Sequence, residues 1–247
     1  MARAHFQSQL ATLRDEVLTL GKLVTDALDR AVECLQEGDG RTATAIVTDD
    51  RAIDVRHAVI QRLAIRMLTT QQPVASDLRG ITAAMVIASE LERIGDYAAG
   101  IAKLVLRDPG EPALEPPHGL FVMARTARAM LGRSLDAYAQ HDGAQARRIW
   151  QQDSWVDRYQ QTLSRDLLVT MIENPSTLTR ATHQLWIVHN LERVADRSTN
   201  ICEQLIFMIE GEWPDLQELP TAVLPDDLLP RLPDTRPSSE PAAPGGE

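Results

Sequence analysis

Four pairs of acidic residues, each spaced four positions apart, are the residues of this sequence best placed to do chemistry. The pairs are Asp50 and Asp54, Glu92 and Asp96, Asp153 and Asp157, and Glu192 and Asp196. On a helix, residues four apart lie on one face with β-carbons about 5–6 Å apart, so each pair presents two carboxylates side by side. Like charges in this arrangement destabilise a helix unless a partner compensates them.

Two such pairs that face one another would form an oxygen-rich site for metal ions. Four carboxylates converging from two packed helices can bridge one or more cations, which would cancel their mutual repulsion. Hard oxygen ligands suit Mg, Mn, Ca and ferric iron, and zinc tolerates them, so the spacing leaves the metal undetermined. The alternative is that the acids lie on solvated faces and pair with nearby arginines, namely Arg51, Arg93, Arg158 or Arg193. Because the pattern occurs in four pairs, we favour the metal site.

Long helices must position these pairs. Apolar residues recur at helical spacing between breaks that include Gly38-Asp39-Gly40, Gln72-Pro73, His141-Asp142-Gly143 and Asn174-Pro175. Aromatic residues make up 4% of the chain and hydrophobic residues 44%, a balance that favours aliphatic helix packing over a β-sandwich. The pattern predicts an all-α protein with six helices, over residues 6–37, 41–71, 75–107, 118–141, 144–173 and 177–211. The short turns between them indicate two tandem three-helix bundles of long antiparallel helices.

An internal repeat divides the chain into two halves. The hexapeptide Leu91-Glu-Arg-Ile-Gly-Asp96 recurs one hundred residues later as Leu191-Glu-Arg-Val-Ala-Asp196, and the pair at Asp50 and Asp54 recurs at an offset of 103. We therefore expect a first three-helix repeat over residues 1–112 and a second over residues 113–212. Each repeat carries one acidic pair on its second helix and one on its third.

The composition changes abruptly at Trp213. Eight of the 14 prolines fall in the last 35 residues, so residues 213–247 are expected to form an acidic, disordered tail. The net charge of −10 argues against nucleic acid as a partner, because affinity for phosphate backbones comes from clustered Lys and Arg. The folded body should therefore end near residue 212 and bind no nucleic acid.

No stretch of the sequence is suited to enter a membrane. The most apolar run, residues 81–88, is too short to span a bilayer, and polar residues follow Met1 where a signal peptide would be apolar. Cys34 and Cys202 are isolated from one another, which suits buried thiols in a reducing compartment. These features predict a cytoplasmic protein without membrane insertion.

Several segments together resemble the PhoU family. They are Gln71-Gln-Pro-Val-Ala-Ser-Asp-Leu-Arg79, Leu91-Glu-Arg-Ile-Gly-Asp96, Leu191-Glu-Arg-Val-Ala-Asp196 and Asn200-Ile-Cys-Glu203, and the resemblance covers nearly the whole body. It implies two three-helix bundles related by an internal pseudo-twofold axis. It also implies multinuclear clusters of Fe, Mn, Mg or Zn on the bundle surface, bound by Asp50, Asp54, Glu92, Asp96, Asp153, Asp157, Glu192 and Asp196.

The same resemblance implies a function without catalysis. Members of the family act as negative regulators of phosphate uptake and of phosphate-starvation signalling, through the ATPase subunit of the phosphate ABC transporter and a phosphate-sensing histidine kinase, and dimers are common. Two departures stand out: Tyr97 and Arg197 follow the motif aspartates where many members have histidine, and Gly100 stands where the second repeat has Asn200. The first site is therefore expected to differ from the second in occupancy.

Two enzyme classes compete with this interpretation. A ferritin-like di-metal oxidoreductase would use Glu-x-x-His pairs on helices, but the nearest arrangements on the expected helices are Asp54 with His57 and the reversed His189 with Glu192. A phosphotransfer domain could use His57, His183 or His189, yet a lone histidine on a helix has no built-in activator. Neither a P-loop nor a nucleophile elbow occurs. The sequence thus favours a non-enzymatic, metal-binding adaptor.

Overall fold

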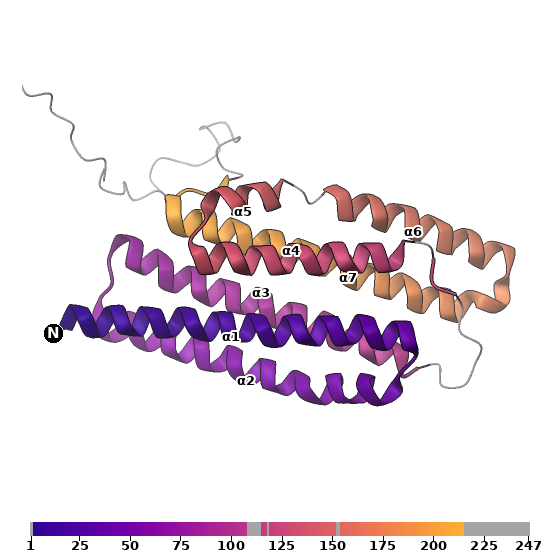
Figure 1. Cartoon of the computed structure of the whole chain (residues 1–247), viewed down its shortest axis with the longest axis horizontal. Coiled ribbons are helices and arrows are strands. Elements are labelled where there is room, and N and C mark those ends of the chain that lie inside the picture. Colours follow the sequence, from indigo (N-terminus) through magenta and orange to yellow (C-terminus); the bar gives the residue numbers. More distant parts are fainter. Residues whose placement is uncertain (1, 108–114, 118, 152–153, 215–247) are drawn as a thin grey trace, which may run out of the picture. The chain divides into compact units, whose positions relative to one another are not determined.

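The computed structural model describes residues 2–107, 115–117, 119–151 and 154–214, and these residues contain helices and no strand (Figure 1). The elements are α1 (Ala2–Glu37), α2 (Gly40–Gln71), α3 (Ala75–Val105), α4 (Leu120–Gln140), α5 (Gly143–Trp150), α6 (Ser154–Glu173), the 3₁₀ turn η1 (Pro175–Thr177) and α7 (Leu178–Glu210). The predicted all-α fold is confirmed. None of the described helices combines the length and the apolarity that crossing a membrane requires.

Local turn chemistry ends the helices where the sequence predicts. After α1, Gly38 adopts a φ of 68°, which glycine tolerates, and the Asp39 side chain then accepts a hydrogen bond from the Arg41 backbone N–H at 2.9 Å. Asp142 caps α5 in the same way, through the Gln145 backbone N–H at 2.8 Å. The breaks expected from Gly, Pro, Asp and Asn coincide with the helix ends at Glu37, Gln71, Gln140 and Glu173.

The expected helix over residues 144–173 is occupied by two helices, α5 and α6. At the end of α5, the Gln151 backbone N–H donates to the Arg147 carbonyl at 3.1 Å. Residues 152–153 lie outside the described residues, and α6 begins at Ser154. In place of the one expected helix, the second bundle therefore has a short helix, α5, followed by a longer one, α6.

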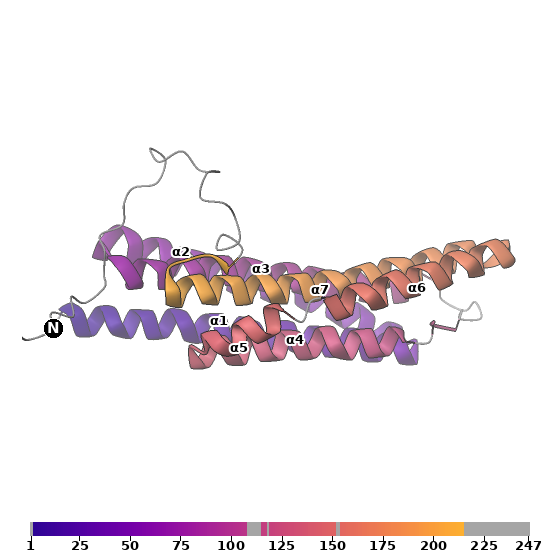
Figure 2. The same cartoon turned by 90° about the horizontal axis from the view of Figure 1, so that it is seen from above.

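The two three-helix repeats share one continuous core. Helices α1, α2 and α3 pack together, as do α4, α5, α6 and α7, and between the repeats α3 lies along α7 and α1 along α4 (Figures 1 and 2). Both helices contribute apolar residues to the core, with Ile87, Leu91, Val188 and Leu191 all buried. The four central helices thus form the middle of the molecule, and α2, α5 and α6 cover its outer sides.

The expected limits of the repeats and of the tail meet the structure only in part. The boundary between residues 112 and 113 falls within 108–114, which lie outside the described residues. Trp213, placed in the tail by its composition, stacks on Phe207 with ring centroids 4.5 Å apart, and Pro214 is buried. The packed chain therefore continues to Pro214, while residues 215–247 lie outside the part described.

A glycine lets α2 and α3 approach one another beside the first acidic pairs. A methyl group added to Gly95 would lie 2.9 Å from Cδ1 of Ile53, which is too close for two carbon atoms. In the second repeat, the positions that correspond by offsets of 100 and 103 are Ala195 and Val156, and both are buried. Compared with the first repeat, the second has one carbon more at Ala195 and one carbon fewer at Val156. The combined side-chain volume of the two positions is therefore about the same in both repeats.

We expect Gly95→Ala to be destabilising by itself and to be rescued by Ile53→Val. Alone, the added methyl group overpacks the contact, while the double variant reproduces the residues of the second repeat. A double-mutant cycle should give a coupling energy of about 1–2 kcal/mol in favour of the double variant. Urea unfolding followed by circular dichroism measures it. Gly80→Ala on the same helix is the control, since its Cβ would meet nothing within 4 Å and should add about 1 kcal/mol of stability. If the effects of Gly95→Ala and Ile53→Val on the free energy of unfolding were additive, the two positions would not compensate for one another.

Candidate metal centre

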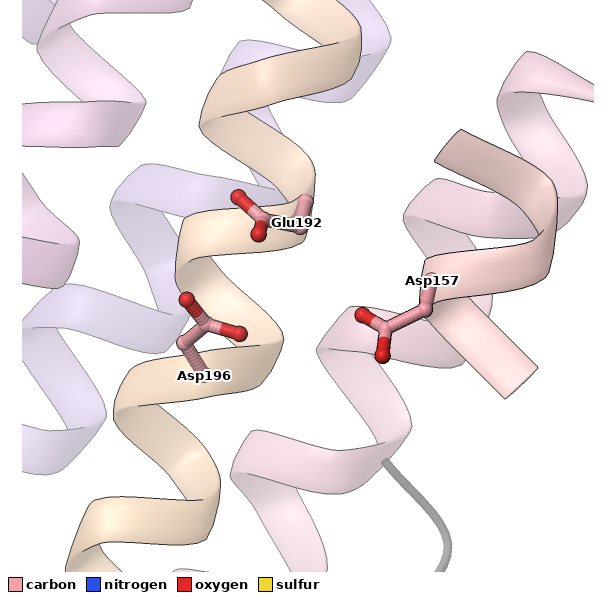
Figure 3. A group of neighbouring side chains, drawn as sticks. All are labelled: Asp157, Glu192 and Asp196. Carbon is pink, nitrogen blue, oxygen red and sulfur yellow. The ribbon is translucent and has the colours of Figure 1, made fainter. Parts of the chain in front are cut away.

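Three of the predicted acids converge between α6 and α7. Asp157 on α6 and Glu192 and Asp196 on α7 each offer a carboxylate oxygen, and the three atoms lie within 4.8 Å of one another. Figure 3 shows Glu192 and Asp196 one turn apart on their helix, with the Asp157 side chain reaching toward them from the facing helix. Asp153, the fourth acid predicted for this site, lies outside the described residues.

The apolar faces of the two helices place these acids at the edge of the core. On α7, Leu191, Val194 and Ala195 are buried, so the intervening positions fall at the boundary, where the side chains of Glu192 and Asp196 are 20% and 26% exposed. This boundary faces α6, on which Asp157 directly follows the buried Val156. The local sequence pattern places each carboxylate at the edge of the core, and the packing of α6 on α7 brings the three together.

The three acids repel one another in a partly desolvated place. Burial, and then the charge of Asp196, raise the pKa of Glu192, while Arg193 and His189 lower it. Burial also raises the pKa of Asp196, where Arg193 opposes and Asp157 adds to the shift. Both shifts mean that the ionised forms are disfavoured in the protein alone. A bound cation would reverse this effect.

Arginine pairing, the alternative to a metal, accounts for only part of this cluster. Nη1 of Arg193 donates to Oδ2 of Asp196 at 3.1 Å. Oε2 of Glu192 is buried without a hydrogen-bond donor among the described residues, and Nε of Arg193 and Nδ1 of His189 lie 3.6 and 3.5 Å away from it. A carboxylate oxygen in this situation, with two other acids nearby, fits the ligand set of a hard cation.

The acids of the first repeat also face one another, but less closely. Burial raises the pKa of Asp50, and the charges of Asp96 and Asp54 raise it further. Burial followed by Asp54 raises the pKa of Asp96, and burial followed by Asp96 raises that of Glu92. Among the described residues, however, these four acids do not form a set of three within 4.8 Å as those of the second repeat do. The acids of the two repeats therefore differ in how closely they approach one another, and the expected difference in metal occupancy stays a prediction.

The residue after the second motif aspartate pairs with a carboxylate outside the acidic cluster. Nη1 of Arg197 donates to Oε2 of Glu90 on α3 at 3.2 Å, and Nδ2 of Asn200 donates to the same oxygen at 3.1 Å. In the corresponding place of the other repeat, a methyl group on Gly100 would lie 3.0 Å from Nδ2 of Asn190. Both departures from the family pattern thus belong to the contact between α3 and α7. Sequence reasoning missed Glu90, whose counterpart in the repeat is the neutral Asn190.

The histidines considered for phosphotransfer have different surroundings. Nε2 of His57 lies 3.1 Å from Oγ of Ser89 and 3.0 Å from Nε2 of Gln61, so that nitrogen already has partners. His189 lies beside Glu192, as noted, and the ring of His183 lies 6.3 Å from that of Trp186. The partners of His57 are a hydroxyl and an amide, and the carboxylate beside His189 belongs to the acidic cluster, so neither contact indicates a histidine activated for phosphotransfer.

Comparison with known proteins identifies relatives over almost the whole body. The PhoU domain family matches the chain twice, over residues 17–105 and 120–205. A phosphate-specific transport system accessory protein PhoU homolog from Clostridium acetobutylicum is 34% identical over 219 residues, which cover 88% of this chain and 100% of that protein. A homolog of the same name from Streptococcus pneumoniae is 35% identical over 214 residues, which cover 87% and 99%.

Solved structures confirm the relationship. PhoU from Pseudomonas aeruginosa superposes with a TM-score of 0.79 at 31% identity, covering 84% of this chain and 100% of that one. The phosphate transport system regulatory protein PhoU from Streptococcus pneumoniae superposes with a TM-score of 0.77 at 33% identity, covering 84% and 98%. One domain match falls within each of the two repeats. From the shared fold, the repeated domain and the extended identity, we conclude that the chain belongs to the PhoU family.

Proposed function

We propose that this protein is a metal-binding adaptor that negatively regulates phosphate uptake and phosphate-starvation signalling. The observation that carries the proposal is its similarity, over 84–91% of the chain, to proteins named as accessory proteins of the phosphate-specific transport system. The proposed partners are the ATPase subunit of the phosphate ABC transporter and the phosphate-sensing histidine kinase, both in the cytoplasm. A homodimer is part of this proposal, and catalysis is not.

Asp157, Glu192 and Asp196 would hold a metal ion in the second repeat, with Asp153 as a further candidate ligand. A bound cation would supply positive charge to the three carboxylates and link α6 to α7. Asp50, Asp54, Glu92 and Asp96 would serve the first repeat in the same way. The ion would be Fe, Mn, Mg or Zn, all of which accept carboxylate ligands. In this proposal the metal fixes the angle between helices whose other surfaces meet the partners.

Elemental analysis of protein purified without chelator tests the metal part. We expect wild type to carry bound metal, and the Glu192→Gln, Asp196→Asn variant to lose more of it than the Glu92→Gln, Asp96→Asn variant, because the second-repeat acids lie closer together. Glu33→Gln with Glu37→Gln is the matched control, since these acids are exposed and have the same spacing on α1. Wild type without metal, or equal metal in all variants, would contradict the site.

Binding experiments with purified partners test the adaptor part. Immobilised full-length protein should retain the ATPase subunit and the cytoplasmic part of the kinase, and cells lacking the protein should take up phosphate without restraint. Oxygen consumption on addition of ferrous iron would instead favour the ferritin-like oxidoreductase. Normal regulation of phosphate uptake in cells lacking the protein would contradict the proposal, whatever metal it binds.

A further inference from the structure

A cavity of about 550 Å³ lies where both repeats meet, away from the acidic clusters. Its walls come from α1 and α3 of the first repeat and from α4 and α7 of the second, and they include Leu10, Arg14, Gly80, Ala84, Tyr138 and Met208. Gly80 precedes Glu92 by 12 residues, so the cavity lies about 18 Å along α3 from the acids at a rise of about 1.5 Å per residue. The volume falls in the range that small-molecule sites in proteins occupy.

The cavity has a cation in its wall. Arg14 is one of the residues that line the cavity, and its guanidinium is permanently charged and has donors only. Tyr138 lines the same cavity, where burial raises the pKa of its phenol and the charge of Arg14 opposes that shift. An anionic oxygen is the acceptor that a guanidinium binds most strongly. This wall therefore suits an acidic group.

The rest of the cavity is suited to an apolar body of modest size. Leu10, Ala84 and Met208 supply aliphatic surface, and a methyl group placed on Gly80 would meet nothing within 4 Å, so there is open room beside α3. The carboxylate of Asp77 also lines the cavity. Its negative charge disfavours a polyanion, and a ligand with a single acidic group suits the site better.

We propose that this cavity binds a small organic anion, with its phosphate or carboxylate group on Arg14 and its apolar part against Leu10, Ala84 and Met208. Such a ligand contacts α1, α3, α4 and α7 at once, so its binding stabilises one arrangement of the two repeats relative to others. The site requires neither the metal nor the transport partners and can be tested without them.

Isothermal titration calorimetry with phenyl phosphate and benzoate as probes tests the cavity and distinguishes the two acidic groups. We expect at least one probe to bind the full-length protein at one site per chain. Arg14→Gln should weaken that binding about tenfold or more, because it removes the charge. Gly80→Leu should abolish it by filling the space, while removing a helix-destabilising glycine. Arg125→Gln, at an exposed position of α4, removes the same charge elsewhere and should leave the affinity unchanged.

Three results would overturn the proposal. The first is the absence of binding of either probe to wild type, and the second is an affinity that survives both Arg14→Gln and Gly80→Leu. The third is inorganic phosphate binding as tightly as phenyl phosphate, which would mean that the apolar wall contributes nothing. Thermal melts show that each variant is folded, and Arg14→Lys, which keeps the charge, should retain more affinity than Arg14→Gln.

Discussion

Arg197→Met is expected to lower the free energy of unfolding by about 3–5 kcal/mol, because it leaves the carboxylate of Glu90 buried without its cation. The two side chains are only 17% and 12% exposed, and the pair joins α7 to α3 across the contact between the repeats. Asn200 still donates to Glu90 in the variant, but a neutral amide compensates the charge only in part. Urea unfolding followed by circular dichroism measures the loss.

A second substitution separates the charge effect from packing. Adding Glu90→Gln to Arg197→Met removes the uncompensated charge, so the double variant should be more stable than Arg197→Met alone. Arg125→Met, at an exposed position of α4, is the control and should change stability by less than about 0.5 kcal/mol. If Glu90→Gln restored nothing, the loss would come from the missing aliphatic contacts of Arg197.

The second large effect concerns the acidic cluster of the second repeat, where we expect the sign of a substitution to depend on metal. In metal-free protein, the variant Asp157→Asn, Glu192→Gln, Asp196→Asn should be more stable than wild type, because it removes three repelling charges. With metal at about 100 times its dissociation constant, wild type should gain about 2.7 kcal/mol at each site, and the variant should lose that gain at the second site. Differential scanning calorimetry with and without chelator compares the two.

The pH dependence gives the same test an independent control. The pKa values of Glu192 and Asp196 are raised in the folded state, so native protein binds these protons more tightly than unfolded protein does. The stability that these groups contribute is complete below their unfolded pKa values and is lost as pH rises through the folded ones. The advantage of the amide variant in metal-free protein should therefore shrink as pH falls from 7 toward 4. A constant difference over that range would contradict mutual repulsion.

The sequence was sufficient to predict what depends on neighbours along the chain. Helix ends follow from residues such as Gly38, Asp39 and Asp142, because caps and left-handed turns are local. The shared face of Glu192 and Asp196 follows from their four-residue spacing beside buried positions such as Leu191, whereas the approach of Asp157 depends on the packing of α6 against α7. The interruption between α5 and α6 was not expected, because apolar periodicity continues through the region.

Contacts across helices were harder to predict. The pairing of Glu90 with Arg197 joins residues 107 positions apart, and a pattern within one helix carries no information about it. The exchange of a methyl group between Gly95 with Ile53 and Ala195 with Val156 is visible only when the two repeats are aligned and then placed in space. In both cases, the sequence shows different residues at corresponding positions of the two repeats: Glu90 corresponds to Asn190, and Gly95 to Ala195.

The pairing of Glu90 with Arg197 also favours contact between a first and a second repeat over contact between two identical repeats. Two first repeats brought together would place each Glu90 opposite Tyr97 and Gly100, which carry no positive charge, and two second repeats would place each Arg197 opposite Asn190. Only the mixed pair unites the carboxylate with the guanidinium. After an ancestral duplication, this single asymmetric contact would make the two copies mutually dependent and would disfavour the exchange of like halves between neighbouring molecules.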